Sequence, residues 1–571
     1  MTYSFLSRTR IVSLGLLVLA LILIGKLFLV QVVHKNSYSE RADRQYATPS
    51  SDIFERRTIF FERKDGQLVS AATQTTGFKL AITPNKIVNV ENVYQKLAGK
   101  ITLDHGSFVA KASKKDDPYE EIADRLSKEQ ADAISAEKIS GVSVYKEKWR
   151  FYPGDTLASH TLGIVGYKGN EFSGRYGIER QYNSELSRDV DNPYVNFFAE
   201  VFSNINETLF KKSKPGGDVV TTIEPAVQGF LEKKLSEVKE KENVDAVGGI
   251  IMNPKDGSIY ALSAKPDFNP NNFSQETDAS IFANPLIEHV LEFGSVVKPL
   301  VMAAGLDTGV VTADTKYNDR GFVIIDKKQI NNFDKKGRGN GISMQEVLNQ
   351  SLNTGMVFVY QHLGKQNLHD YMLSYGVKEK TGIDLPNETS GLVSNFLKSP
   401  RDLENANASF GQGVSFTPME MIRALASLSN GGNLVTPHIV KAIKYDDGTE
   451  KVLSYPTKPT KISGKTSEEI TRMLVNVMDA YMKNKITNLE HYSIASKTGT
   501  AQVAKEGGGG YYEDRHTHSF FSYFPAYDPK FIVFLYAVNP KGVPYAFQTW
   551  SDPFLDLSKF LINYYEIPPD R

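Results

Sequence analysis

A serine and a lysine stand three positions apart in an otherwise apolar stretch, EFGSVVKPLVMAAGLDTG at residues 292–309. On a helix, positions i and i+3 share a face, so the Ser295 hydroxyl and the Lys298 amine would be neighbours. Pro299 is tolerated only near a helix start, which places Ser295 close to a helix amino terminus. Burial lowers the pKa of a lysine, and a neutral amine can accept the proton of an attacking serine. These residues favour nucleophilic catalysis, although a lysine that extends to solvent fits this stretch equally well.

Two further motifs follow along the chain. Ser351 and Asn353 lie in LNQSLNTGM, and Lys497-Thr498-Gly499-Thr500 lies in SIASKTGTAQV. Ser351 can relay a proton between the lysine and a leaving amine, and Asn353 can hydrogen-bond the backbone of a substrate. The order Ser-x-x-Lys, Ser-x-Asn, Lys-Thr-Gly is the set shared by penicillin-recognising enzymes.

The Lys-Thr-Gly-Thr motif has the groups to bind an anionic end of a substrate. Lys497 and the hydroxyls of Thr498 and Thr500 can hold a carboxylate. Gly499 would let a substrate approach the strand backbone closely. The backbone N–H groups of Ser295 and Thr500 can form an oxyanion hole for the tetrahedral intermediate.

Other patterns of the same kind are weaker. Ser-x-x-Lys recurs at 135–138 and 236–239, in charged helical stretches where a lysine is simply solvated. A second Lys-Thr-Gly at 380–382 leads into a turn rather than a strand. His516 and His518 could bind a metal, but no third ligand is evident, so we expect no metal and no organic cofactor. No Gly-x-Ser-x-Gly elbow occurs, which leaves a Ser-His-Asp hydrolase unsupported.

Composition excludes several classes of protein. The chain has 571 residues, 41% hydrophobic and 23% charged, a balance typical of globular domains. Its 66 basic and 66 acidic residues give no net charge, and no basic block indicates a nucleic-acid partner. The absence of cysteine excludes disulfides, thiol catalysis and Cys-ligated zinc.

The amino-terminal region predicts a membrane anchor. Residues 11–33 are apolar except for Ser13, Lys26 and Gln31. As a helix this segment would span about 35 Å, enough for a hydrocarbon core of roughly 30 Å. It is too long for the core of a signal peptide, and no good cleavage site follows it. Positive residues flank it almost equally, so charge alone does not set its orientation.

The rest of the chain predicts two further domains. Residues 34–215 are strand-rich, with strands at 77–84 and 141–153 and an exposed helix at 117–138. A linker is expected at 211–218, and residues 216–571 begin with a strand and a long helix at 218–242. A hairpin at 246–266, a mainly helical block at 286–435 and strands from 491 to 538 follow, and strands from both ends of this domain should form one sheet.

At this point the chain resembles the class B penicillin-binding proteins, which are monofunctional peptidoglycan D,D-transpeptidases. The resemblance spans roughly residues 27 to 540. Arg57 and Glu62 depart from the family pattern, where glycine and aspartate are usual. The stretches that carry the resemblance are LFLVQVVHKNSYSERADRQY, RRTIFFERKDGQLV, RFYPGDTLASHTLGIVG, GIERQYNSEL, EFGSVVKP, SFGQGVSFTPMEMIRALASLSNGGNLVTPHIV and HSFFSYFPAYDPK.

The resemblance implies an α+β multi-domain fold. A cytoplasmic tail (1–10) and a single transmembrane helix (11–33) would precede an elongated pedestal or dimerisation-type domain (34–215). The transpeptidase domain (216–571) would have a central antiparallel sheet flanked by helices, as in β-lactamases. The protein would sit in the bacterial cytoplasmic membrane with its amino terminus inside and its catalytic domain on the external or periplasmic side.

The same resemblance implies the reaction. Ser295 would attack the penultimate D-alanine of a stem peptide that ends in D-Ala-D-Ala, with Lys298 as base, and an amine of a neighbouring stem would resolve the acyl-enzyme into a crosslink. β-Lactams would trap Ser295 covalently. The expected partner is a membrane glycan polymerase of the SEDS class, together with other division or elongation proteins; the motifs do not separate these two branches.

Two alternatives remain at this stage. A β-lactamase needs a carboxylate that activates a deacylating water, and Glu388 lacks the Glu-x-x-x-Asn setting of the class A enzymes. A non-catalytic penicillin-binding sensor or scaffold would bind ligand without crosslinking. A sensor usually has more membrane spans, and a scaffold would tolerate the loss of motif residues that are all present here.

Overall fold

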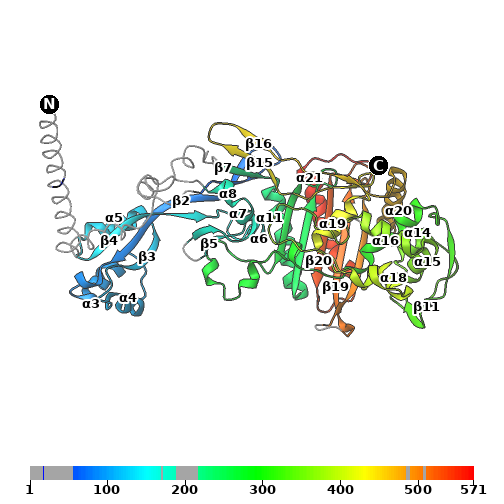
Figure 1. The fold of residues 1–571 in the computed structure, drawn as a ribbon, viewed down its shortest axis with the longest axis horizontal. Helices are drawn as coiled ribbons and strands as arrows, with labels where there is room; N and C mark the ends of the chain where they lie inside the picture. Colours follow the sequence, from blue (N-terminus) through cyan, green and yellow to red (C-terminus); the bar gives the residue numbers. More distant parts are fainter. Residues whose placement is uncertain (1–16, 18–55, 169–170, 188–215, 484–488, 506–508) are drawn as a thin grey trace, which may run out of the picture. The chain divides into compact units, whose positions relative to one another are not determined.

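The computed structural model describes residues 17, 56–168, 171–187, 216–483, 489–505 and 509–571. The chain forms two compact units. The described part of the first is residue 17 and residues 75–149, and the second comprises residues 56–74 together with the described residues from 150 to 571 (Figure 1). Residues 211–215 of the predicted linker at 211–218 lie outside the described residues, so the expected domain boundary there stays a prediction.

The first unit packs short helices against strands. Its core contains Leu80, Leu97, Phe108 and Ile134. The side chains of Asn89, Asp104 and Ser127 cap the helix amino termini, which satisfies backbone N–H groups that have no partner within the helix. The elements are β2 (Leu68–Ile82, in this unit from Thr75), η2 (Pro84–Lys86), α3 (Val90–Ala98), α4 (His105–Ala112), β3 (Glu120–Leu126), α5 (Lys128–Ala136) and β4 (Val142–Phe151, in this unit as far as Trp149).

The strands expected at 77–84 and 141–153 are confirmed as parts of β2 and β4. The helix expected over 117–138 is wrong in its first half, because residues 120–126 form β3, which pairs antiparallel with β2. The helix begins only after Ser127, whose side chain and that of Gln130 form a capping box. Pairing with a neighbouring strand therefore outweighed local helix propensity here.

The second unit begins with short elements around a buried ion cluster. Glu179 contacts the guanidinium groups of Arg56 and Arg150, and all three side chains are almost completely buried. The Tyr152 hydroxyl donates a hydrogen bond to the same carboxylate (3.3 Å). The elements are β1 (Ile59–Glu62), α6 (Ser159–Leu162), β5 (Val165–Lys168), β6 (Glu171–Gly174), α7 (Gly177–Gln181), α8 (Asn183–Leu186) and β7 (Gly217–Thr221).

A five-stranded antiparallel sheet forms the centre of the second unit. Its strand order is β18-β19-β20-β8-β9, with β8 (Ala246–Met252) and β9 (Ile259–Lys265) from the start of the predicted catalytic domain. β18 (Ala495–Ala504), β19 (Tyr511–Phe524) and β20 (Phe531–Val538) come from its end. Figure 1 shows the green strands beside the orange and red ones. The prediction that both ends of the domain build one sheet is confirmed.

Helices cover both faces of this sheet because its side chains alternate between two apolar cores. Phe520 and Leu535 pack with α11 (Pro225–Glu242) and α21 (Ala546–Tyr564). Phe521 and Phe534 belong to the larger core on the other face, together with the apolar residues of α13 (Lys298–Asp307). β18 is an edge strand, so one of its edges remains open for other groups.

The block expected to be mainly helical also contains strands. β10 (Lys316–Asp319), β11 (Phe322–Ile325), β12 (Lys328–Asn331) and β13 (Gly339–Ser343) form two small antiparallel pairs. The helical prediction is therefore wrong for residues 316–343. The remaining elements are η3 (Phe273–Gln275), η4 (Ala279–Phe282), α12 (Pro285–Glu288), η5 (Gly294–Val297), α14 (Met344–Asn349), α15 (Asn353–Leu363), α16 (Lys365–Ser374), α17 (Ser394–Lys398), α18 (Asp402–Ala408), α19 (Pro418–Ala426), β14 (Asn433–Leu434), β15 (Val440–Tyr445), β16 (Glu450–Val452), β17 (Lys458–Pro459) and α20 (Gly464–Met482).

The predicted anchor at residues 11–33 lies outside the described residues, apart from residue 17. Across the ranges that the structure describes, none of the helices has both the length and the hydropathy that crossing a membrane requires.

Candidate active site

The three sequence motifs converge on one cavity of about 1170 Å³ beside the β18 edge of the central sheet. The first motif contributes Ser295, and the second contributes Ser351 and Asn353. The third contributes Lys497, Thr498 and Thr500. Lys298 is fully buried behind this surface, and Gly499 does not line the cavity.

Ser295 lies in a tight turn directly before a helix. The turn is η5, and α13 continues from it, with Pro299 in the first turn of the helix as the sequence predicted. Gly294 has a φ of +63°, which glycine adopts without strain. A Cβ on Gly411 would lie 2.1 Å from the Gly294 carbonyl oxygen, so two glycines are needed for the backbones to meet here. The serine therefore sits on a backbone that is held from two sides.

Lys298 is buried without a carboxylate among its hydrogen-bond partners. Its Nζ lies 2.6 Å from the Ser351 carbonyl oxygen, 3.2 Å from Ser351 Oγ and 2.8 Å from Asn353 Oδ1. Desolvation lowers the pKa of Lys298 well below its ordinary value, and the nearby charge of Lys497 lowers it further. The solvated lysine that the sequence left open is excluded, since this side chain has no exposed surface.

Lys497, from the third motif, also contacts the hydroxyl of Ser351. Its Nζ lies 3.0 Å from Ser351 Oγ, and burial lowers its pKa to about 7. The Ser351 hydroxyl therefore bridges two amines, and it can accept from one while it donates to the other when that one is neutral. Ser351 has a φ of +54°, in the left-handed region that non-glycine residues rarely adopt. Backbone strain of this kind concentrates at functional sites.

The alternation of β18 divides the third motif between two faces. Thr498, Thr500 and Gln502 are half-buried and line the cavity. A Cβ on Gly499 would lie 2.3 Å from the Phe293 carbonyl oxygen and 2.4 Å from Ser519 Oγ. The close approach that Gly499 permits is thus made by the turn that carries Ser295. The expectation that Gly499 also admits substrate to the strand backbone stays a prediction.

The weaker patterns have other roles in the structure. Thr381 and Gly382 donate hydrogen bonds to Glu388, so the second Lys-Thr-Gly and this glutamate satisfy each other away from the cavity. His518 is buried against Thr549. Among the described residues no group of three histidine, cysteine or carboxylate side chains could hold a metal ion.

Sequence reasoning missed two parts of the cavity wall. One is a polar wall that includes Arg338 and Gln350, next to Ser351. The other is an aromatic rim, in which Tyr545 stacks on Phe547 and meets the edge of Phe333. All three rings are more than one third exposed, although they are large and apolar. No short motif marks either wall, because each combines residues far apart in the sequence.

Comparison with known families matches both halves of the chain. The family model described as "Penicillin binding protein transpeptidase domain" matches residues 247–553. The model described as "Penicillin-binding Protein dimerisation domain" matches residues 61–221.

Relatives match over most of their length. Stage V sporulation protein D of Bacillus subtilis is 30% identical over 502 residues, covering 85% of this chain and 76% of that protein. Peptidoglycan D,D-transpeptidase FtsI of Buchnera aphidicola is 25% identical, covering 100% of this chain and 96% of that protein. The crystal structure of penicillin binding protein 2X from Streptococcus thermophilus has the same fold, with a TM-score of 0.70 and 21% identity over 90% of this chain and 80% of that one.

Proposed function

This chain belongs to the class B penicillin-binding proteins and is a serine-type peptidoglycan D,D-transpeptidase of cell division or elongation, and from that premise we propose that Ser295 is its acylated nucleophile. The observation that supports this role most directly is the pair of buried amines, Lys298 and Lys497, on one serine hydroxyl within the cavity that Ser295 lines. Burying two lysines without a carboxylate partner disfavours their charged forms. A neutral amine close to a serine is what acyl transfer requires.

Acylation proceeds by attack of Ser295 Oγ on the carbonyl carbon of the penultimate D-alanine. Neutral Lys298 accepts the serine proton, and the backbone N–H groups of Ser295 and Thr500 stabilise the oxyanion. The C–N bond then breaks, and the leaving amine of the terminal D-alanine takes a proton through the Ser351 hydroxyl. The products of this step are free D-alanine and an ester on Ser295.

The second step resolves the ester. An amine of a neighbouring stem peptide attacks the ester carbonyl and loses its proton to Lys298. The C–O bond to Ser295 breaks, the serine regains a proton, and a new amide crosslinks the two stems. Because both half-reactions start from an amine or hydroxyl that must be deprotonated, a single base serves both.

The walls of the cavity orient the substrate. The hydroxyls of Thr498 and Thr500 and the charge of Lys497 bind the carboxylate of the terminal D-alanine, while Gly499 packs the strand against the turn of Ser295. Asn353 Nδ2 donates to the Asn331 carbonyl (2.9 Å) and keeps a second N–H for the substrate backbone. The reaction uses no metal or organic cofactor.

Membership of the family supports a proposal for the setting in the cell. We assign residues 1–10 to a cytoplasmic tail, 11–33 to a membrane anchor, 34–215 to a pedestal and 216–571 to the transpeptidase domain on the outer side of the membrane. A SEDS-class glycan polymerase is the expected partner through the anchor and pedestal, and β-lactams are the expected covalent inhibitors.

Labelling with a fluorescent penicillin tests the nucleophile. The wild-type protein should take up one label, and Ser295→Ala should take up none while keeping the wild-type melting temperature. Label retained by Ser295→Ala would remove Ser295 from this role. Release of D-alanine and formation of a crosslinked dimer from stem pentapeptides distinguish a transpeptidase from a sensor or scaffold, and a label lost within seconds would indicate a β-lactamase.

A further inference from the structure

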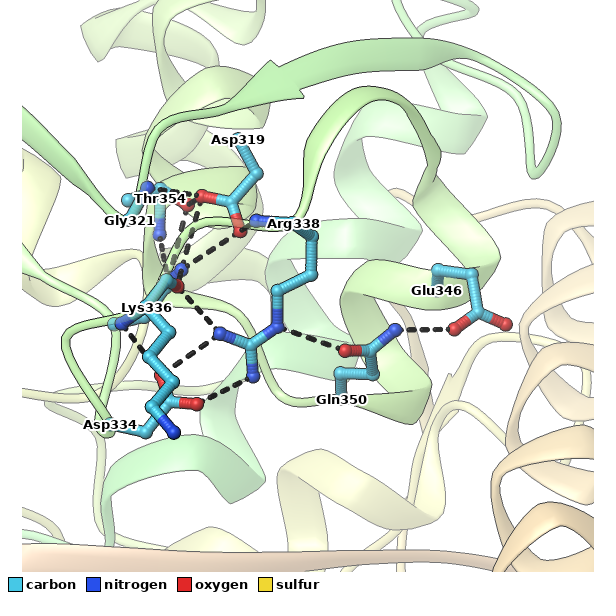
Figure 2. A network of polar contacts seen from close by, with 9 residues as sticks. Asp319, Gly321, Asp334, Lys336, Arg338, Glu346, Gln350 and Thr354 are labelled. Carbon is cyan, nitrogen blue, oxygen red and sulfur yellow. Dashed lines mark hydrogen bonds and ion pairs between the residues drawn. The ribbon is translucent and has the colours of Figure 1, made fainter.

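A buried carboxylate organises the polypeptide next to the Ser-x-Asn motif. Asp319 ends β10, is 1% exposed and accepts hydrogen bonds from four groups. The donors are Thr354 Oγ1 (2.8 Å), the backbone N of Gly321 (2.9 Å), the backbone N of Arg338 (3.0 Å) and Asn332 Nδ2 (3.0 Å). Figure 2 shows these contacts converging on the carboxylate. Four donors can hold a buried carboxylate in one orientation.

The first connection from Asp319 reaches the residue that follows Asn353. Thr354 lies in the first turn of α15, and its hydroxyl donates to Asp319 while it accepts from the Tyr317 hydroxyl (3.1 Å). Asn332, itself bound to Asp319, accepts from the backbone N of Thr354 (3.2 Å). The start of α15 is thus held at both its side chain and its backbone.

The second connection reaches the residue before Ser351. Arg338, whose backbone binds Asp319, donates from Nε to Gln350 Oε1 (3.0 Å), and Gln350 in turn donates to Glu346 (2.8 Å). The guanidinium also pairs with Asp334 at 2.9 Å (Figure 2). Planar, bidentate contacts of this kind hold an arginine side chain in one orientation.

Ser351 lies between these two connections in a strained backbone conformation. Its φ is +54°, a conformation that is strained for any residue other than glycine, so neighbouring contacts must hold the backbone there. Its hydroxyl must at the same time meet both lysine amines, at 3.2 and 3.0 Å. A shift of about 1 Å in such a site can cost roughly 10²-fold in rate.

We propose that Asp319 is a positioning residue for acylation, which holds Ser351 between the two lysine amines by fixing Thr354 on one side and Gln350 on the other. It touches no substrate and acts through the residues it binds. This inference rests on the proposed function, since it assigns Asp319 to the geometry of the same proton transfer.

The variant Asp319→Asn tests this role. It keeps the shape of the side chain but replaces one accepting oxygen by an NH₂ group. That group is itself a donor, and it would face another donor, either the backbone N–H of Arg338 or the Asn332 amide. Active-site titration with a penicillin should still give one acyl group per folded molecule, while the first-order acylation rate falls roughly 10- to 100-fold. The affinity of the non-covalent complex should change much less. A purely structural role would instead lower the acylated fraction and leave the rate of the folded molecules unchanged.

The matched control is Asp384→Asn. Asp384 is also a buried carboxylate with four donors: the backbone N–H groups of Ile439 and Val440 (both 2.8 Å) and the hydroxyls of Tyr182 (3.0 Å) and Tyr455 (3.1 Å). None of these residues lines the cavity. This variant should lose stability to a similar degree and acylate at the wild-type rate.

A second pair of variants covers the case in which Asp319→Asn does not fold. Thr354→Val removes the hydroxyl and should slow acylation about tenfold, whereas Thr354→Ser keeps it and should restore the rate to within about twofold. The inference would be overturned if Asp319→Asn, or Thr354→Val, acylated at the same rate as the control Asp384→Asn. Failure of the wild-type protein to acylate at Ser295 would instead overturn the proposed function.

Discussion

Two regions of the second unit bury positive charge, and they do so in opposite ways. Arg56 and Arg150 are buried on either side of Glu179, which pairs with both. Burial alone would raise the pKa of Glu179, but the two guanidinium groups lower it below its usual value. Lys298 and Lys497 are buried equally well, yet their hydrogen-bond acceptors are hydroxyl, amide and carbonyl oxygens.

The difference separates a structural charge cluster from a reactive one. A guanidinium stays charged in any protein environment, so burying it requires a counter-charge. A lysine can instead give up its proton, and burial without a counter-charge makes it do so near neutral pH. The arginine cluster therefore has one protonation state, whereas the lysine pair has several and can move protons.

The largest effect is expected from a variant that breaks the lysine pair. Lys298→Met should slow acylation of Ser295 by roughly 10²–10⁴-fold, because the general base is lost. The free energy of unfolding should change by less than about 2 kcal/mol, since removing an uncompensated amine offsets its lost hydrogen bonds. Stopped-flow labelling and thermal unfolding measure the two quantities. Acylation within tenfold of the wild-type rate would assign the base to another residue.

The opposite pattern is expected when the arginine cluster is broken. Glu179→Gln leaves two guanidinium groups buried without a counter-charge and should cost about 3–5 kcal/mol of stability. The acylation rate of the molecules that remain folded should not change. Urea denaturation gives the first value and active-site titration the second. A loss below about 1 kcal/mol would mean that the cluster is compensated in some other way.

The pH profile of acylation sharpens the comparison further. The rate should rise with pH as Lys298, whose pKa is lowered, loses its proton and becomes a base. Above about pH 7 the free enzyme should lose rate as Lys497 becomes neutral and attracts the substrate carboxylate less, by up to tenfold per pH unit. The second-order acylation rate constant measured from pH 5 to 10 checks both limbs. A profile flat across this range would show that neither lysine titrates in the reaction.

The smallest effect is expected at an exposed ion pair. Asp446 pairs with Arg57, one of the two residues that depart from the family pattern, and its side chain is 60% exposed. Asp446→Asn should change the free energy of unfolding by only about 0–1 kcal/mol, because solvent screens the pair. The same denaturation experiment measures it. A loss comparable to that of Glu179→Gln would remove the distinction between buried and exposed charge on which the comparison depends.

The sequence predicted the parts of the site whose chemistry is local. Ser295 and Lys298 are three residues apart, so helix geometry alone brings their backbones together. The strand carrying Lys497 and the hairpin of β8 and β9 follow from alternation and turn residues. The order of the three motifs then indicated that they share one cavity.

The parts that the sequence did not predict depend on partners far along the chain. Glu179 meets Arg56 and Arg150 over separations of 123 and 29 residues, and no pattern marks such a cluster. β10 to β13 were missed because they are short and lie inside a helical block. Nothing in the sequence distinguishes Asp319, because three of its four donors lie 13 to 35 residues further along the chain. Gly499 was recognised as a point of close approach, but only the structure shows that Phe293 is what approaches it.

The order of strands in the central sheet also constrains how the protein is made. β8 lies between β9 and β20, so one of its edges stays unpaired until residue 538 has been synthesised. At the usual speed of a ribosome, the gap between these strands corresponds to a delay on the order of 15–60 s. During that time the nascent chain exposes an apolar strand edge of the kind that promotes aggregation, and the Lys-Thr-Gly strand is among the last parts to assemble.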